Sequence, residues 1–474
     1  MRVVKLSCFC KEEHVLVIEM QLRIIKSRGL AHNSYFLSDD GEAAVFDPRR
    51  DCAAYVQLAE EECARIRYIM ETHKNEDYVV GSVELQNKTE AEIVHSKEGH
   101  FKYGEHNLVD DDVINVGSLS IKALYTPGHT IDSMCYVVYE LAKSYPLMVF
   151  TGDTLLAGEV GRTDLFGQET QQRRAEQLYE SLHEKLLPLG DQALVYPAHG
   201  PGSVCGFQIS NRTYTSIGYE RKVNDRLQLD KASFVEHMAR QPLLIPPYFA
   251  QVEKYNENGP PLIKDAFLPL KPGQFQQEMV KSNSVIVDAR EPGAFAGSYI
   301  PGALNIWLNG LSLFSGWVLT YNDAILLVVD RPQDVHTAQA YLWRLGFDNL
   351  VGYLCSGMQQ WRNSGKEINH LATISADEVN AQLSRRALTV LDVRDENEWN
   401  AGHIRGAKHI YVGFLKDEAR QLSHDIPIVT QCSVGDRAGL AASILKKLGF
   451  NNVYNLLGGM QAWQSRGYPV DRGE

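Results

Sequence analysis

The pattern of apolar and polar positions predicts alternating strands and helices in roughly the first 250 residues. Short apolar runs bounded by turn-forming residues are typical of strands, whereas apolar positions three or four apart are typical of helices. Two stretches have the helical pattern, near Ala53–Glu62 and Gln171–Leu187. The strand-like runs are Tyr35–Leu37, Ala43–Phe46, Arg67–Met70, Ser120–Leu124, Leu147–Phe150 and Ala193–Tyr196.

The remainder of the chain is a duplication. The segment Ser284–Ala303 parallels Thr389–Ala407, and residues 281–370 repeat as 384–474. A period of about 100 residues indicates duplicated domains, because solenoid repeats run about 20–50 residues. In each copy, buried-strand patterns alternate with amphipathic helices, which predicts a small α/β domain with a central parallel sheet. These patterns cover Val285–Val287, Ile325–Val329, Val390–Leu391 and Ile428–Thr430, and the helices His336–Leu345 and Arg437–Leu448.

A proline-rich segment separates the two parts. Seven prolines fall between residues 239 and 272, which is typical of an extended linker. We therefore expect an α/β multidomain protein with five segments. They are a leader (1–19), an N-terminal domain (20–250), a linker (251–272), a first repeated domain (273–371) and a second repeated domain (372–474).

Composition and charge narrow the function classes. With 474 residues, 47 Lys+Arg and 59 Asp+Glu, the net charge is −12, which disfavours nucleic acid or an anionic membrane as a partner. Lys11, Glu12 and Glu13 interrupt the N-terminal apolar stretch before a signal peptide can form. No apolar run has a transmembrane length. Eight scattered cysteines do not form a disulfide framework. We expect a cytoplasmic protein with free thiols.

Four polar clusters in the N-terminal domain each follow a predicted strand. Residues just beyond the carboxyl ends of strands meet in one crevice of an α/β layer, so these clusters can converge despite their sequence separation. Histidines and carboxylates in such a crevice predict a metal site. The clusters are Glu71–Tyr78, Tyr125–Thr130, Thr151–Thr154 and Tyr196–Gly200.

In this order, the clusters resemble the metallo-β-lactamase superfamily, over about residues 20–235. That pattern is H-x-H-x-D-H, a TPGH histidine, a GD aspartate and a final histidine, and it implies an αββα sandwich. Asn75 and Tyr78 stand where the second and third histidines belong. The retained ligands form one site of His73, His129 and Asp153. Asp77 and His199 remain for a second metal site or as neighbours of the first.

Two histidines and a carboxylate form the facial triad of non-haem Fe(II) oxygenases. The sequence resembles the persulfide dioxygenase branch, in which the matching residues His73, His129 and Asp153 hold iron. The resemblance also implies that Arg162 shapes a thiol-substrate pocket, although an ion pair with a loop carboxylate is an equal alternative. Cys205 places a thiol near the metal or is a packed core cysteine.

Cys432 follows an apolar strand and precedes a predicted helix. Backbone N–H groups at such a helix N-terminus favour an anion and lower the pKa of a cysteine. With the upstream Asp392-Val-Arg394, the segment Cys432–Arg437 resembles the rhodanese sulfurtransferases. The resemblance implies that Cys432 carries a sulfane sulfur, that Gly435 contributes to the binding loop and that Arg437 closes it. Its six residues fit sulfur better than the seven-residue loop of dual-specificity phosphatases.

Two further features concern sulfur chemistry. The charge of Asp436 near the loop favours a monoanionic persulfide donor over dianionic thiosulfate. The first repeated domain has Val329-Asp330 at the corresponding strand end, and its one cysteine, Cys355, lies elsewhere. We expect a rhodanese-like fold without sulfur transfer there, which acts as a spacer or a dimerisation surface.

Together, these features predict a persulfide dioxygenase and sulfurtransferase of sulfide metabolism. It would use Fe(II), O₂ and a low-molecular-weight thiol persulfide, form sulfite and thiosulfate, and act as a homodimer. Three alternatives stay open: a zinc-dependent thioester hydrolase of the glyoxalase II type, a metal-free docking domain beside one active rhodanese, and a sulfur-relay partner without small-molecule turnover.

Overall fold

A computed structural model describes residues 20–473, except 141, 142, 144, 166, 207, 241–243, 265, 266, 384 and 386. The predicted leader, residues 1–19, lies outside the described residues. The chain divides into two compact units. The N-terminal unit runs to Ile263 and includes Trp343–Gly346, and the C-terminal unit comprises Lys264–Leu342 and Phe347–Glu474.

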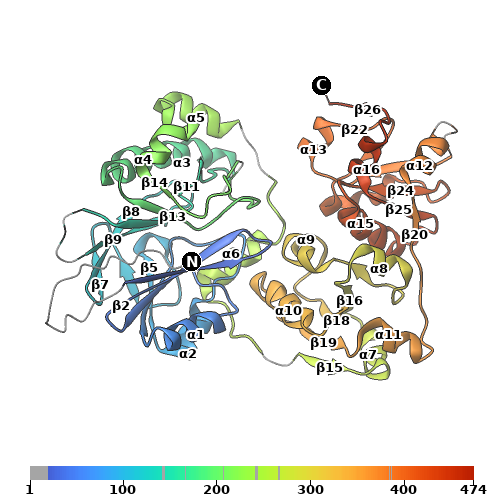
Figure 1. The fold of residues 1–474 in the computed structure, drawn as a ribbon, viewed down its shortest axis with the longest axis horizontal. Coiled ribbons are helices and arrows are strands. Elements are labelled where there is room, and N and C mark those ends of the chain that lie inside the picture. The colour runs from blue at the N-terminus through green and yellow to red at the C-terminus, as the bar shows by residue number, and fades with distance from the viewer. Residues whose placement is uncertain are drawn as a thin grey trace, which may run out of the picture. The chain divides into compact units, whose positions relative to one another are not determined.

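Two six-stranded sheets form the framework of the N-terminal unit (Figure 1). The first sheet has the order β1-β2-β3-β4-β5-β6: Gln21–Ser27, His32–Asp39, Glu42–Phe46, Arg65–Met70, Glu92–Ser96 and His106–Leu108. The second has the order β14-β13-β10-β9-β8-β7: Thr215–Ser216, Leu194–Pro197, Met148–Gly152, Met134–Glu140, Leu119–Tyr125 and Val113–Val116. A small hairpin, β11 (Leu155–Leu156) and β12 (Glu159–Val160), lies beyond β10.

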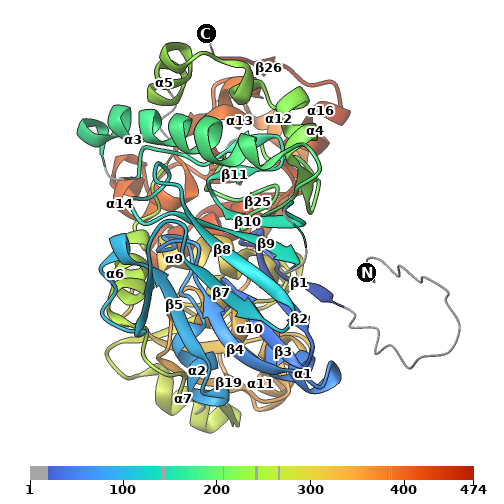
Figure 2. The ribbon, with the colours of Figure 1, turned by 90° about the vertical axis from the view of Figure 1, so that its left-hand side faces the viewer.

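Helices cover the outer face of each sheet, so the unit is an αββα sandwich (Figure 2). Tyr55 and Leu85 of α1 and α2 pack against the first sheet, whereas Leu178, Ile217 and Phe234 of α3, α4 and α5 pack against the second. The helix α3 continues into a π-helical turn, Ser181–Leu186. The bounds are α1 Ala53–Glu61, α2 Ser82–Thr89, α3 Gln168–Glu180, α4 Ile217–Val223, α5 Lys231–Ala239 and α6 Phe249–Asn258.

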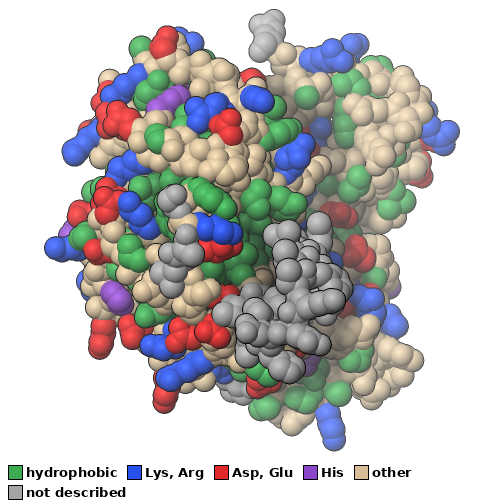
Figure 3. Space-filling model, turned by 60° about the vertical axis from the view of Figure 1, so that its left-hand side comes forward, with side chains coloured by type: hydrophobic (Ala, Val, Ile, Leu, Met, Phe, Trp, Pro, Cys, Tyr) green, Lys and Arg blue, Asp and Glu red, His purple; other side chains and the backbone are tan. Residues whose placement is uncertain are grey.

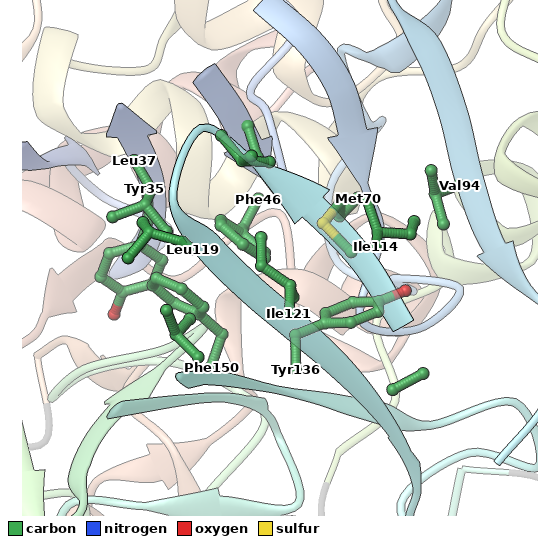
Figure 4. Packing of buried hydrophobic residues seen from close by; sticks show 14 of the residues in the cluster. Tyr35, Leu37, Phe46, Met70, Val94, Ile114, Leu119, Ile121, Tyr136 and Phe150 are labelled. Carbon is green, nitrogen blue, oxygen red and sulfur yellow. The ribbon is translucent and has the colours of Figure 1, made fainter. Parts of the chain in front are cut away.

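The main core lies between the two sheets (Figure 4). Alternate residues of each strand point inward, as the period of two along a strand requires. Burial of each large apolar side chain contributes roughly 1.5–3 kcal/mol. Packing between the inner faces fixes the positions of the strands, and therefore of the polar clusters that follow the strand ends. The labelled residues are Tyr35, Leu37, Phe46, Met70 and Val94 from the first sheet, and Ile114, Leu119, Ile121, Tyr136 and Phe150 from the second.

The expected linker is not extended throughout. Helix α6 (Phe249–Asn258) covers its first residues and buries Phe249, Val252 and Asn256. The prolines of this segment flank the helix, with Pro246–Pro247 before it and Pro260–Pro261 after it. Proline is tolerated before the first turn and beyond the last, so these residues delimit a helix instead of preventing one.

The C-terminal unit contains the duplicated domains, each with a five-stranded sheet whose strand pairs are all parallel. The first has the order β15-β19-β18-β16-β17: Leu268–Leu270, Leu350–Leu354, Ala324–Val328, Ser284–Asp288 and Leu304–Asn305. The second has the order β20-β25-β24-β21-β23: Ala372–Ile374, Val453–Leu456, Ile428–Gln431, Thr389–Asp392 and Lys408–His409. The strands β22 (His403–Ile404) and β26 (Val470–Asp471) pair separately.

The helices also repeat. The first domain has α7 Pro272–Met279, α8 Pro292–Gly297, α9 Leu311–Val318, α10 Asp334–Arg344 and α11 Gly357–Asn363. The second has α12 Ala376–Leu383, α13 Glu396–Ala401, α14 Leu415–Glu418, α15 Asp436–Lys447 and α16 Gly459–Ser465. A buried ion pair occurs in both copies: Nη2 of Arg290 lies 2.6 Å from Oδ2 of Asp288, and the same atoms of Arg394 and Asp392 are 2.6 Å apart.

The surface carries charges of both signs. Lysine and arginine side chains are interspersed with aspartate and glutamate on the face that Figure 3 shows. Among the described helices, none is both long and apolar enough to cross a membrane.

Candidate metal centre and cysteine loop

Three predicted ligands converge beyond strand ends in the N-terminal unit. His73 follows β4, His129 follows β8 and Asp153 follows β10. Oδ2 of Asp153 lies 3.8 Å from Nε2 of His73 and 3.6 Å from Nε2 of His129, and the three ligand atoms lie within 4.8 Å of one another. Both Nε2 atoms are buried without a hydrogen-bond partner. Buried unpartnered nitrogens are costly unless something binds them, so the trio fits a metal ion.

The second ring nitrogen of each histidine is held by the protein. Nδ1 of His129 lies 2.8 Å from the carbonyl oxygen of Arg162. Nδ1 of His73 lies 2.9 Å from Oγ1 of Thr72, which in turn donates to Asp47. A donor hydrogen on Nδ1 leaves the lone pair of Nε2 directed at the site. Both histidines are therefore oriented as metal ligands.

A second set of donors adjoins the first. The ligand atoms of Asp77, His199 and Cys205 lie within 4.8 Å of one another, and all three residues are buried. Nε2 of His199 is 3.1 Å from Oδ2 of Asp77, and its Nδ1 is 2.8 Å from both oxygens of Asp153. His199 thus connects the two sets, because it contacts a carboxylate of each.

The charges of the histidines and carboxylates at this site shift one another's pKa values. Although burial opposes it, His199, His129 and His73 hold the pKa of the Asp153 carboxyl well below its usual range. Burial would lower the pKa of His199, but Asp153 and Asp77 raise it well above its usual value. Asp153 is therefore ionised at neutral pH and available as a carboxylate ligand.

Asn75 and Tyr78 have structural contacts. Nδ2 of Asn75 donates to the carbonyl of His73 at 3.2 Å. The ring of Tyr78 packs against that of His32 in a tilted arrangement, with 4.0 Å between centroids. Asn256 of α6 donates to the backbone carbonyls of Asn75 and Tyr78, at 2.7 and 2.8 Å. These contacts anchor the loop that carries His73, although two ligands of the motif are absent.

Glu76 lies between His129 of the trio and Cys205 of the second set. The sequence patterns did not single it out. Its Oε1 is 3.6 Å from Nε2 of His129 and accepts a hydrogen bond from Sγ of Cys205 at 3.4 Å. Although burial opposes it, His129 and His73 lower the pKa of Glu76 to about 2. In the sequence, the signal that could have identified Glu76 is its position as an acidic residue inside the histidine motif. Glu76 is thus a second ionised carboxylate beside the trio.

Arg162 forms the loop ion pair that the sequence offered as one of two interpretations. Its Nε and Nη2 donate to Asp164 at 2.7 and 2.8 Å, and Nη1 donates to the carbonyl of Val204 at 3.1 Å. The side chain is 1% exposed. Because its backbone carbonyl also contacts Nδ1 of His129, Arg162 fixes one wall of the candidate site. The predicted contact between Arg162 and a substrate stays a prediction.

In the C-terminal unit, Cys432 lies in a loop between β24 and α15. The backbone N–H of Gly435 donates to Sγ of Cys432 at 3.1 Å. Gly435 has φ of 120°, in a region of backbone conformation that favours glycine. The carbonyl of Cys432 accepts from Met460 at 2.8 Å. The sulfur therefore lies at a helix N-terminus inside a hydrogen-bonded loop.

Arg437 contacts a residue that the sequence did not predict. Its Nη2 donates to Oε1 of Glu398 and to Oγ of Ser433, both at 2.8 Å. Oγ of Ser433 also donates to Oε1 of Glu398 at 2.6 Å. Glu398 comes from α13, far from the loop in sequence. Arg437 is therefore held in an ion pair beside the loop.

The first repeated domain differs at the same position. The register pairs Asp288 with Val328 and Asp392 with Gln431, so Val329 corresponds to Cys432. A cavity of about 460 Å³ lies there, lined by residues that include Arg290, Val329 and Asp330. No cysteine is among its lining residues. The described part of this domain therefore has the fold without a thiol at the loop.

Family models match both units. The metallo-beta-lactamase superfamily model matches residues 27–199, and the rhodanese-like domain model matches residues 271–364 and 375–466. The mitochondrial persulfide dioxygenase ETHE1 of Bos taurus is 31% identical over 210 residues, which are 43% of this chain and 75% of that protein. The chain belongs to the metallo-β-lactamase superfamily. Two rhodanese-like domains follow its metallo-β-lactamase domain.

Other relatives extend this result. The probable metallo-hydrolase YqgX of Bacillus subtilis (strain 168) is 30% identical over 191 residues, 36% of this chain and 85% of that protein. The crystal structure of a metallo-beta-lactamase from Staphylococcus aureus subsp. aureus COL is 27% identical, with a TM-score of 0.63, and covers 71% of this chain and 98% of that chain. The fold class and the family resemblance predicted from the sequence are confirmed.

Proposed function

We propose that this member of the metallo-β-lactamase superfamily is a persulfide dioxygenase and sulfurtransferase. The convergence of His73, His129 and Asp153, with both histidine Nε2 atoms unpartnered, carries the proposal. The name of the ETHE1 relative and the rhodanese-like domains support sulfane-sulfur metabolism as its context.

The metal in this proposal is Fe(II). Two imidazoles and one carboxylate are the ligand set of non-haem iron oxygenases, and ferrous iron bound by them supplies open positions for a thiol persulfide and O₂. His199 holds Asp153 in place through Nδ1. Glu76 and Cys205 lie beside the trio, and Glu76, as a carboxylate, can accept the proton that the persulfide loses.

The atoms of the first reaction balance without another oxidant. A thiol persulfide, O₂ and water give the thiol, sulfite and two protons, as the terminal sulfur loses the electrons that O₂ gains. The three ligands are buried, which limits the access of bulk water to them. The domain 20–250 would carry this reaction.

Cys432 would carry the second reaction. Its thiolate attacks a sulfane sulfur, the donor's sulfur–sulfur bond breaks, and the donor leaves as a thiolate or as sulfite. The hydrogen bond from Gly435 stabilises negative charge on the cysteine sulfur. Sulfite can then take the sulfur and leave as thiosulfate. The domain 372–474 would hold this site, and the domain 273–371 would act as a spacer in a cytoplasmic homodimer.

Oxygen uptake tests the dioxygenase. The Fe(II)-reconstituted protein should consume O₂ when given cysteamine persulfide and should release sulfite. His73→Ala should lower this rate more than about 100-fold, because loss of even an outer partner of a ligand typically costs 10–100-fold.

His106→Ala is the matched control, since His106 is 39% exposed and lies outside the site. It should retain the rate. Absence of oxygen uptake from a fully iron-loaded sample would contradict the proposal.

A zinc-dependent thioester hydrolase is the second candidate. The second donor set, Asp77, His199 and Cys205, favours it, because two adjacent metals suit hydrolysis. The YqgX relative adds support. Elemental analysis separates the two: one iron per chain with oxygen uptake supports the dioxygenase, and one or two zinc ions with hydrolysis of a glutathione thioester supports the hydrolase.

A further inference from the structure

The cation of the cysteine loop is neutralised by a neighbouring carboxylate. Arg437 donates to Glu398 and Ser433, and Ser433 donates to the same carboxylate oxygen. The side chains of Arg437 and Glu398 are only 18% and 31% exposed, so solvent screens this pair incompletely. An incoming anion thus meets an arginine whose charge is already compensated.

Additional carboxylates surround this pair. Asp436 is the first residue of α15, directly before Arg437. Asp395 forms a capping box with Glu398 at the start of α13. Burial, together with Asp395's contact with Glu398, raises the pKa of Asp395. Around the loop, one arginine therefore faces several acidic groups.

The first rhodanese-like domain contributes another acid. Helix α8 of that domain packs against α15: a Cβ placed on Gly439 would lie 2.9 Å from Cβ of Pro292. Glu291 precedes Pro292, and burial, together with Asp436, raises its pKa. The carboxylates of Glu291 and Asp436 are thus near enough to repel each other. We name the group of Glu291, Asp395, Glu398 and Asp436 the acidic rim.

We propose that the acidic rim selects the sulfur donor of Cys432, and that Glu398 is the specificity-determining residue. The rim slows both dianions that react at Cys432, thiosulfate as donor and sulfite as acceptor, and favours as donors thiol persulfides with a neutral or cationic carrier. This inference rests on the proposed sulfur transfer at Cys432. The energy of a charge in the field of the rim scales with its charge, so thiosulfate is repelled twice as strongly as a monoanion.

The selected reaction needs no further reagent. The Cys432 thiolate attacks the terminal sulfur of the persulfide, a new sulfur–sulfur bond forms, and the original one breaks. The carrier leaves as a thiolate and takes a proton from water. No net oxidation occurs, because sulfane sulfur only changes its carrier.

The variant Glu398→Gln isolates the charge. Glutamine at the third position of a helix can still accept the capping-box hydrogen bond from the backbone of Asp395, which Oε2 of Glu398 accepts at 3.4 Å. Glu396→Gln is the matched control, because Glu396 is exposed on the same helix and lies outside the loop contacts. Asp436→Asn is a second variant that removes a different rim charge.

The experiment uses the full chain and two donors, thiosulfate and cysteamine persulfide, whose ammonium group offsets the persulfide charge. Sulfur loading of Cys432 is followed by intact-protein mass spectrometry. We expect Glu398→Gln to raise the second-order rate constant of loading from thiosulfate roughly tenfold and to change that from cysteamine persulfide less than about twofold. Asp436→Asn should act in the same direction, and Glu396→Gln should leave both values unchanged.

Ionic strength gives a readout that a purely structural role would not move. In the wild type, loading from thiosulfate should become faster as salt screens the rim, and this acceleration should be smaller in Glu398→Gln. Equal changes for both donors, or no salt dependence, would overturn the inference. Failure of both donors to load the wild-type Cys432 would instead overturn the proposed sulfur transfer.

Discussion

At the scale of single residues, the candidate metal site depends on groups outside the ligand trio. Asp47 has φ of 47°, in the left-handed region that few residues other than glycine adopt. In this conformation both of its carboxylate oxygens accept hydrogen bonds from Thr72, at 2.8 and 2.9 Å. Oγ1 of Thr72 is also the partner of Nδ1 of His73. The strained backbone at Asp47 thus supports a chain of contacts that ends at a ligand.

This chain predicts the effect of a change at Thr72. Thr72→Val keeps the shape but removes the partner of His73 and leaves Oδ2 of Asp47 without a donor. We expect the Kd for Fe(II) to rise roughly 10–100-fold, as for other partners of metal-binding histidines. Competition against a chromophoric chelator measures this.

Thr72→Ser should restore the affinity to near the wild-type value, since it retains Oγ. If the valine variant folds and binds Fe(II) as tightly as the wild type, the orientation of His73 does not depend on Thr72.

At the scale of elements, the candidate functional residues follow strand ends, and neighbouring elements hold them in place. The loop after β24 is held by the start of α16, where Met460 and Gln461 donate to the carbonyls of Cys432 and Ser433 at 2.8 and 3.0 Å. Gly459 allows this approach. It has φ of 51°, and a Cβ there would lie 2.1 Å from the carbonyl oxygen of Cys432.

Gly459→Ala should therefore displace the cysteine loop. We expect sulfur loading of Cys432 to fall more than about tenfold and the thermal unfolding midpoint of the C-terminal unit to drop, because backbone atoms cannot yield to the methyl group. Mass spectrometry and calorimetry measure the two effects.

Gly449→Ala is the control, since Gly449 also has positive φ, 89°, but an added Cβ meets nothing within 4 Å. It should lose only about 1 kcal/mol of stability from backbone strain and retain loading. Equal loss of loading in both variants would mean that strain, and not the contact with Cys432, matters.

The elements also show where sequence reasoning succeeds and fails. Short apolar runs located strands such as β2, which is buried along its whole length, and β8, in which buried and partly buried residues alternate. Motif order predicted that His73, His129 and Asp153 converge, and they do so where the end of β4 in the first sheet meets the ends of β8 and β10 in the second. It did not find Glu76 or Glu398. Each acts through a contact that depends on how a short loop or helix packs, and no spacing rule encodes that packing.

At the scale of the whole molecule, the residues named for each candidate site belong to one unit. His73, His129 and Asp153 belong to the N-terminal unit, whereas Cys432 and Arg437 belong to the C-terminal unit. The contacts described around each site also come from its own unit. The two proposed reactions are linked by chemistry, because the sulfite released by the first is an acceptor for the second.

Because the two sites are separate, we expect a variant at either site to lose one activity and retain the other. Cys432→Ser should retain oxygen uptake from cysteamine persulfide but accumulate sulfite, since no protein persulfide remains to convert sulfite into thiosulfate. His73→Ala should lose oxygen uptake, yet form thiosulfate when sulfite is supplied with the persulfide. Cys355→Ser, which alters the other described cysteine of the C-terminal unit, should behave as wild type. Loss of oxygen uptake in a folded, iron-loaded Cys432→Ser protein would show that the dioxygenase requires the cysteine. The prediction that the two sites act independently would then be wrong.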